Sequence, residues 1–183
     1  EINLSYNYQD RPEYTRNMIS TSFGYNGNIR NRFFYQVYPA QLNVVKLFNL
    51  DDNFYKTLAN DPFLRNAYQN HFDLGSGATL YYTTNSAVNP QDTYFYSRLQ
   101  FDIAGNILRA FSPVMKKDSN GSGMIWNTPF SQFVRGELTL GRTWVFGRNS
   151  GHSLATRLLA GAGYAYGNSN ALPFEKHFYG GGA

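Results

Sequence analysis

The stretch Tyr94-Phe95-Tyr96-Ser97-Arg98-Leu99-Gln100-Phe101-Asp102-Ile103-Ala104 contains two interleaved sets of side chains. The apolar set is Phe95, Leu99, Phe101 and Ile103, and the polar set is Arg98, Gln100 and Asp102. Successive side chains of a β-strand point to opposite sides of a sheet, so this alternation predicts a strand with one apolar and one polar face. The stretch is longer than the mean globular strand of about 5–6 residues and reaches the length of about 9–11 residues that a tilted strand needs to cross a membrane.

The same alternation recurs along the chain and predicts seven strands in all. They are residues 2–8, 14–26, 32–45, 71–84, 94–104, 130–146 and 152–166. Pro39 interrupts the third, and because proline cannot donate a hydrogen bond to a ladder, it predicts a bulge or a kink there. Between the third and fourth strands, Asp51 or Asp52 can cap a short helix that ends near Ala59.

The connections between the predicted strands alternate in length. Residues 27–31, 85–92 and 147–151 form short turns, whereas residues 47–69, 105–127 and 167–183 form long connections. Outer-membrane β-barrels have tight turns on one side of the membrane and long loops on the other. The turn at residues 9–13 is short although its place in the series belongs to the long side. The pattern predicts an all-β, antiparallel, up-and-down transmembrane β-barrel, with residues 47–69 and 105–127 outside the cell.

The composition favours a membrane barrel over a soluble sheet. Charged residues make up only 15% of the chain, compared with about 25% in an ordinary soluble domain. The mean hydropathy is −0.46, which a barrel tolerates because its apolar face is hidden by alternation. Aromatic residues stand at the ends of the predicted apolar faces, as in the aromatic girdles that membrane barrels have at the membrane–water interfaces. They are Tyr25, Tyr82, Trp144, Phe146, Tyr164 and Tyr166. A soluble β-sandwich with an aromatic core is the alternative.

Several kinds of chemistry have no signature in the sequence. The absence of cysteine excludes a disulfide framework and a thiolate metal site. His71, His152 and His177 lack metal-ligand spacing, so we expect no metal ion. Nucleotide-binding and serine-hydrolase motifs are also missing, so we expect neither a cofactor nor an enzyme. The net charge of +4 comes from scattered lysines and arginines, which gives no reason to expect a nucleic-acid partner.

Seven strands with two open edges do not make a complete membrane barrel. Each unpaired backbone group inside a bilayer costs several kcal/mol. The chain also starts within a strand-like run at Glu1 and stops after the glycine run 180–182. We therefore expect residues 1–183 to be part of one larger outer-membrane barrel domain, whose remaining strands come from other sequence.

Charged residues gather on the polar faces of two predicted neighbouring strands. They are Arg98, Asp102, Arg135 and Glu137. One interpretation is a charge network in the barrel lumen that binds the final loop, where buried pairs would mainly fix geometry. The alternative is ordinary lining of a water-filled interior.

The final segment carries many ring and apolar side chains, which an exposed loop would leave in water. We predict that residues 167–183 enter the barrel interior, with Glu175, Lys176 and His177 meeting polar groups and Phe178 packing near the wall. The glycine run at the end permits a sharp turn or a close approach to that wall. The candidate residues of this inward segment are Pro173, Phe174, Glu175, Phe178, Tyr179, Gly180, Gly181 and Gly182.

A family resemblance rests on the last strand and the segment after it. Residues 158–167, Leu-Leu-Ala-Gly-Ala-Gly-Tyr-Ala-Tyr-Gly, precede Leu172-Pro173-Phe174 and Phe178-Tyr179-Gly180-Gly181. This resembles the stretch just before the R-G-[FYW] motif of the BamA/TamA family of outer-membrane assembly proteins, in the bacterial surface antigen superfamily. Residues 39–46 and 60–64 are similar to one branch of that family. The motif itself, with its loop arginine, is not in this chain.

The resemblance implies a sixteen-stranded barrel preceded by periplasmic modules, with these strands as the fifth to the eleventh. The last segment would be the sixth outer loop, which folds into the lumen. The implied function is non-enzymatic: assembly and insertion of β-barrel proteins in the outer membrane of a Gram-negative bacterium. Partners would be outer-membrane lipids, nascent β-barrel clients, and lipoproteins or periplasmic proteins of an assembly complex. A passive porin or transporter barrel, or a soluble β-rich binding protein, is the alternative.

Overall fold

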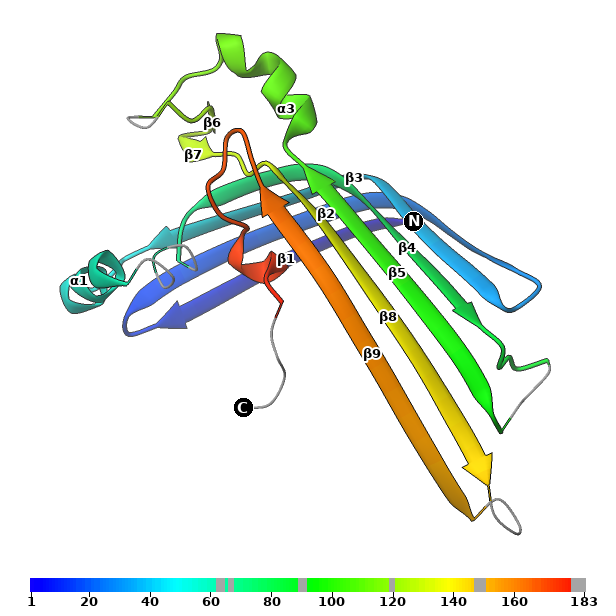
Figure 1. Ribbon diagram of the computed structural model, residues 1–183. Helices are drawn as coiled ribbons and strands as arrows, with labels where there is room; N and C mark the ends of the chain where they lie inside the picture. Colours follow the sequence, from blue (N-terminus) through cyan, green and yellow to red (C-terminus); the bar gives the residue numbers. More distant parts are fainter. Residues whose placement is uncertain (62–64, 66–67, 89–91, 119–120, 147–150, 179–183) are drawn as a thin grey trace.

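Seven strands form one antiparallel sheet in the order β1-β2-β3-β4-β5-β8-β9 (Figure 1). The computed structural model describes residues 1–61, 65, 68–88, 92–118, 121–146 and 151–178. The strands of this sheet are β1 (Ile2–Arg11), β2 (Tyr14–Ile29), β3 (Phe33–Phe48), β4 (His71–Thr83), β5 (Tyr94–Ala104), β8 (Phe133–Phe146) and β9 (His152–Ala165). Each pairs with the next long strand of the chain, which confirms the predicted antiparallel up-and-down topology. Among the described residues β1 and β9 do not pair, so the sheet is open.

The strand register gives the sheet two unlike faces. Leu99 pairs with Leu80 on one side and with Leu138 on the other, so these three side chains share a face. We call this the apolar face; it also carries Tyr6, Ile19, Val44, Phe72, Phe101, Leu140 and Leu158. Asp102 pairs with Arg135 on the opposite, polar face. The alternation read from the sequence therefore runs through all seven strands.

Pro39 marks the irregular point of β3. The pairing of β3 with β4 shifts between Tyr38 and Gln41, which confirms the predicted bulge. The carbonyl oxygen of Pro39 accepts a hydrogen bond from Ser76 Oγ at 2.7 Å. The extra residue lets both Val37 and Ala40 lie on the apolar face, so the two faces stay continuous along the strand.

The β2–β3 turn begins later than the sequence predicts. Arg30 and Asn31 both have φ of 54°, the left-handed conformation typical of tight hairpins. Gly27 is still paired with Tyr35, so the strand continues past the predicted turn start. The β1–β2 turn is also tight, because only Pro12 and Glu13 separate the strands.

The long connections contain structure of their own. Helix α1 (Asp52–Asn60) is capped by Asp51, whose carboxylate accepts from the amide of Asn53 at 3.0 Å, as predicted. Residues 105–127, predicted as a long connection, contain α3 (Asn106–Phe111), η1 (Ser112–Val114) and β6 (Met124–Ile125), and β7 (Thr128–Pro129) follows them. The final segment contains η3 (Phe174–Lys176). Among the described residues, no helix has the length and apolar character needed to span a membrane.

Two small cores lie at the end of the sheet where the long connections are. The core on the polar face joins Tyr14, Val45 and Leu47, with Phe54 and Tyr68 packed against them. Burial there, together with the adjacent Tyr14, raises the pKa of Tyr68. The core on the apolar face joins Phe72, Leu108 and Phe130, with Leu42, Val44, Leu74, Met115 and Ile125 at its margin. The long connections are therefore packed on both faces of the sheet at this end.

Candidate functional site

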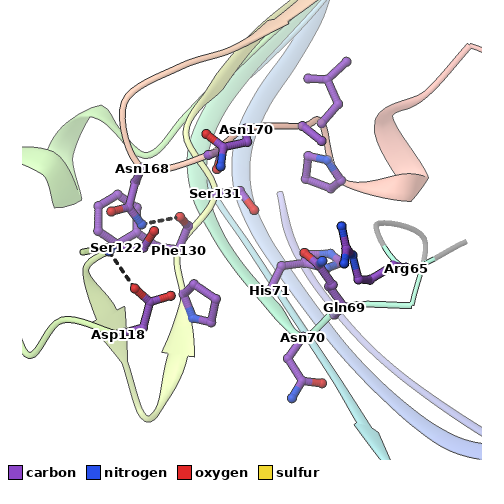
Figure 2. A pocket seen from close by; sticks show the side chains of 15 residues that line it. Arg65, Gln69, Asn70, His71, Asp118, Ser122, Phe130, Ser131, Asn168 and Asn170 are labelled. Atoms are coloured by element: carbon purple, nitrogen blue, oxygen red, sulfur yellow. Dashed lines mark hydrogen bonds between the residues drawn. The ribbon is translucent and has the colours of Figure 1, made fainter. Parts of the chain in front are cut away.

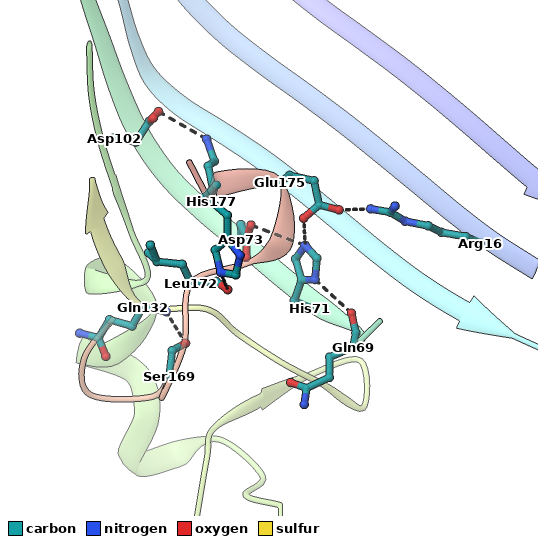
Figure 3. Close-up of polar contacts among 11 residues, drawn as sticks. Arg16, Gln69, His71, Asp73, Asp102, Gln132, Ser169, Leu172, Glu175 and His177 are labelled. Carbon is teal, nitrogen blue, oxygen red and sulfur yellow. Dashed lines mark hydrogen bonds and ion pairs between the residues drawn. The ribbon is translucent and has the colours of Figure 1, made fainter. Parts of the chain in front are cut away.

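The segment that follows β9 turns back and lies on the polar face of the sheet (Figures 1 and 3). We call residues 167–178 the docked segment. Its groups contact four strands, through Arg16 of β2, His71 of β4, Asp102 of β5 and Arg135 of β8. These contacts make the docked segment and the strands beneath it the candidate site.

The docked segment is fixed at its root by Asn168, whose side chain is buried (Figure 2). Asn168 Oδ1 accepts from the amide of Gly123 at 2.7 Å, and Nδ2 donates to the carbonyls of Gly123 and Phe130 at 3.1 and 2.7 Å. Gln132 Oε1 accepts from the Asn168 amide at 3.0 Å, while the Gln132 amide donates to Ser169 Oγ at 2.8 Å. Buried polar groups are costly without partners, so this network sets the path of the chain.

Arg135 is the centre of the first group of charged contacts, which we call the Arg135 cluster. Its guanidinium is 2.7 Å from Glu137 and 3.7 Å from Asp102, measured between the nearest nitrogen and oxygen atoms. Its Nε donates to the carbonyl of Lys176 at 3.0 Å, and its guanidinium carbon lies 4.3 Å from the centre of the Phe178 ring. Lys176 Nζ lies 3.5 Å from Asp102. One arginine thus contacts the sheet and the docked segment at once.

Glu175 is the centre of the second group, which we call the Glu175 cluster (Figure 3). Its carboxylate pairs with Arg16 and lies 3.3 Å from Nε2 of His71. The same Nε2 is 3.8 Å from Asp73, and Nδ1 is 3.1 Å from the carbonyl of Gln69. Both ring nitrogens of His71 therefore face oxygen atoms, so the ring lies between the docked segment and the sheet.

Two glycines of β9 make room for the docked segment. A methyl group added at Gly161 would overlap the ring of Phe178, and one added at Gly163 would overlap the side chain of Leu172. Both glycines belong to the polar face, because they pair with Glu137 and Arg135. The close approach of a second chain segment accounts for glycine at these positions.

Two polar cavities border the docked segment. One of about 390 Å³ is lined by Gln36, Gln41, Arg98, Gln100, Asp102 and Glu175. The other, of about 580 Å³, lies at the end of the long connections and is lined by Asn70, His71, Asp118, Ser122, Asn168 and Asn170 (Figure 2). Within the described part of the chain, no group of three metal-ligating side chains has a geometry that could hold an ion. The contacts described above attach the docked segment to the seven-stranded sheet.

The structure places all four residues of the predicted lumen network on the polar face and brings three of them together. Arg135 contacts Asp102 and Glu137, whereas Arg98 lines the smaller cavity and forms no ion pair with another described residue. Among the residues of the predicted inward segment, Pro173 is buried and Phe174 begins η3. Glu175 and Phe178 contact the sheet as given above, and residues 179–182 lie outside the described residues.

Sequence reasoning did not single out Arg16, Asp73, Asn168 or Gln132. For Arg16 and Asp73 a signal existed, because each falls on the polar face of its strand. For Asn168 and Gln132 there was none, since their partners lie in separate connections. Comparison of the chain with family models, curated proteins and solved structures found no match.

Proposed function

We propose that this chain forms part of the wall of an outer-membrane β-barrel that assists the folding and insertion of other β-barrel proteins. The family resemblance of the sequence suggests this activity, and two features of the molecule support it. One is the contrast between the faces of the sheet, and the other is the docked segment.

The apolar face suits contact with lipid. Leu99 is 45% exposed and Leu138 is 39% exposed, although both lie near the middle of their strands. Hydrocarbon would cover these side chains, while the polar groups of the opposite face would line the interior of the barrel. Strand pairing between neighbours satisfies the backbone groups that a bilayer penalises.

The observation that carries the proposal is the position of the docked segment. The stretch that resembles the lumen-inserted loop of the BamA/TamA family is the stretch that lies on the polar face, held by Glu175, Lys176 and Asn168. In the proposed activity a client adds its strands at a weak edge elsewhere in the barrel. In this proposal the chain supplies the wall and the seat of the loop.

A reconstitution experiment tests the activity. The full-length protein that contains this chain is inserted into lipid vesicles, and a denatured small β-barrel protein is added. We expect the client to fold several times faster than in empty vesicles. A passive pore would instead give steady ion conductance without any change in the folding rate, and that result would overturn the proposal.

Leu138→Arg tests the orientation of the sheet. The substitution places a charge on the apolar face, and near the bilayer midplane this should destabilise the folded protein by about 2–4 kcal/mol. Denaturant unfolding in lipid measures the change. The control is Gln100→Arg, which places the same charge on the polar face opposite Glu137. Equal stability of the two variants, in a protein that dissolves without detergent, would favour the soluble alternative.

A further inference from the structure

The connection between β5 and β8 folds over the apolar face of the sheet. Leu108 of α3 is buried in the core formed with Phe72 and Phe130, whose margin includes Val44 and Leu74 of the same face. The ring of Trp126 meets that of Phe72 edge to face, with 5.8 Å between the ring centres. This connection is therefore seated on the side of the sheet that we assign to lipid.

The connection also carries a second group of large apolar side chains that are mostly exposed. Ile107, Phe111, Val114 and Trp126 are between 57% and 85% exposed. The first three are spaced by four and three residues, which places them along one side of α3 and η1. Exposed large apolar side chains on one side of a helical segment usually mark an interaction site.

Basic residues lie close to these side chains in the sequence. Arg109, Lys116 and Lys117 are exposed, and in residues 105–118 the only acidic residue is Asp118. The Asp118 carboxylate accepts a hydrogen bond from the amide of Ser122 at 2.8 Å. A short segment that combines aliphatic and tryptophan side chains with lysine and arginine has the composition of a membrane-interface anchor.

We propose that Ile107, Phe111, Val114 and Trp126 insert among the lipids of the outer leaflet, and that Arg109, Lys116 and Lys117 bind lipid headgroups of net negative charge. We call these residues the interfacial patch. The inference rests on the proposed function, because it requires the apolar face to be in lipid.

Two observations favour lipid over a protein partner. The patch adjoins the apolar face, because Trp126 contacts Phe72 of that face and Leu108, next to Ile107 in α3, is buried in the same core. It also lies at the end of the strands, where headgroups meet a membrane-spanning sheet, and its positive charge complements them. Long basic side chains can keep their charged ends in the headgroup layer while their stems lie against apolar neighbours.

Spin labelling of the full-length protein in vesicles tests the inference, and the described chain contains no native cysteine to interfere. Nitroxides are attached at Val114→Cys in the patch, at Leu138→Cys on the apolar face, and at Tyr55→Cys on α1 as the exposed control. Collisions with oxygen report lipid, and collisions with a nickel chelate report water. We expect the oxygen-to-nickel ratio at Val114 to be several times that at Tyr55.

The outcomes separate this inference from the proposed function. A Leu138 label that collides mainly with the nickel chelate lies in water, and this result would overturn both the proposed function and this inference. A Leu138 label in lipid together with a Val114 label in water would overturn only the interfacial patch. A Val114 label shielded from both reagents would indicate a protein cover and would also overturn it.

The charge of the patch is tested with two vesicle compositions, phosphatidylcholine alone and phosphatidylcholine mixed with phosphatidylglycerol. Replacing both Lys116 and Lys117 by Gln should lower the oxygen-to-nickel ratio at Val114 in the anionic vesicles and leave it unchanged in the neutral ones. A basic residue near an anionic membrane surface contributes a known amount to binding, so each lysine lost should weaken the association of the interfacial patch with the anionic vesicles by about fivefold. An equal change in both vesicle types would refute recognition of anionic headgroups.

Discussion

The Arg135 cluster and the Glu175 cluster hold the same docked segment in different ways. In the first, Arg135 and Asp102 are cross-strand partners on adjacent strands, so the sheet assembles this pair without the segment. In the second, Arg16 and His71 come from β2 and β4, which β3 separates, and the carboxylate that joins them is Glu175 of the segment. The first cluster is a preformed seat, whereas the second exists only when the segment is in place.

The side chains that the docked segment contributes to the two clusters differ in their contact with water. The sheet side chains of both clusters are at most 20% exposed, whereas Lys176 of the segment is 22% exposed and Glu175 is 31% exposed. Water can replace part of the interactions of Glu175. We therefore expect the loss of the Glu175 charge to destabilise the docked segment less than the loss of Arg135 does. Hydrogen exchange of the amides in residues 167–178, measured in the full-length protein, compares the two clusters directly, because it reports the free energy of local opening.

Arg135→Ala should have the largest effect. It removes the contacts to the Lys176 carbonyl and the Phe178 ring, and it leaves Asp102 and Glu137 without their shared cation. The hydrogen bond from this charged group to the docked segment is worth about 2 kcal/mol, which corresponds to exchange about 30-fold faster in the docked segment. The control is Arg98→Ala on the same face, which should leave exchange unchanged. Equal acceleration by both variants would show that Arg135 is not a specific seat.

Glu175→Gln should have a smaller effect. It removes the charge that joins Arg16 and His71 but leaves the preformed seat intact. For a pair that is partly exposed to water we expect a loss of about 1 kcal/mol, or about fivefold faster exchange. Glu13→Gln, at the exposed β1–β2 turn, is the matched control. If Glu175→Gln opened the segment more than Arg135→Ala, the order of the two clusters would be reversed.

Gly161→Ala should have the smallest effect. The added methyl overlaps the Phe178 ring, and this ring can swing away from Arg135 at little cost. We expect exchange near Phe178 to rise about twofold, with no change at Asn168. Gly136→Ala is the control, because no atom lies within 4 Å of a methyl group placed there. The same response from both variants would mean that the effect comes from the strand backbone and not from Phe178.

The sequence predicts the sheet well because each strand carries its own alternation. The faces of Asp102 and Arg135 follow from that pattern, and the short connections predict which strands are neighbours. The pairing of Arg16 with Glu175 does not follow, since 159 residues separate them and their contact depends on the return of the docked segment. Helix α3 was missed because it has only 6 residues and is stabilised by burial of Leu108 against Phe72. The β2–β3 turn was misplaced because Arg30 and Asn31, without glycine, adopt positive φ.

The hydrogen bonds of Asn168 have a mechanical consequence. Its side chain binds both the amide and the carbonyl of Gly123, next to β6, and the carbonyl of Phe130. Asn168 lies near the start of the docked segment on the polar face, whereas Phe130 belongs to the core on the apolar face. The buried side-chain amide of Asn168 therefore links the docked segment on one face of the sheet to the connection between β5 and β8 on the other. The docked segment cannot leave the polar face at Asn168 unless these three hydrogen bonds break or the connection between β5 and β8 moves with it.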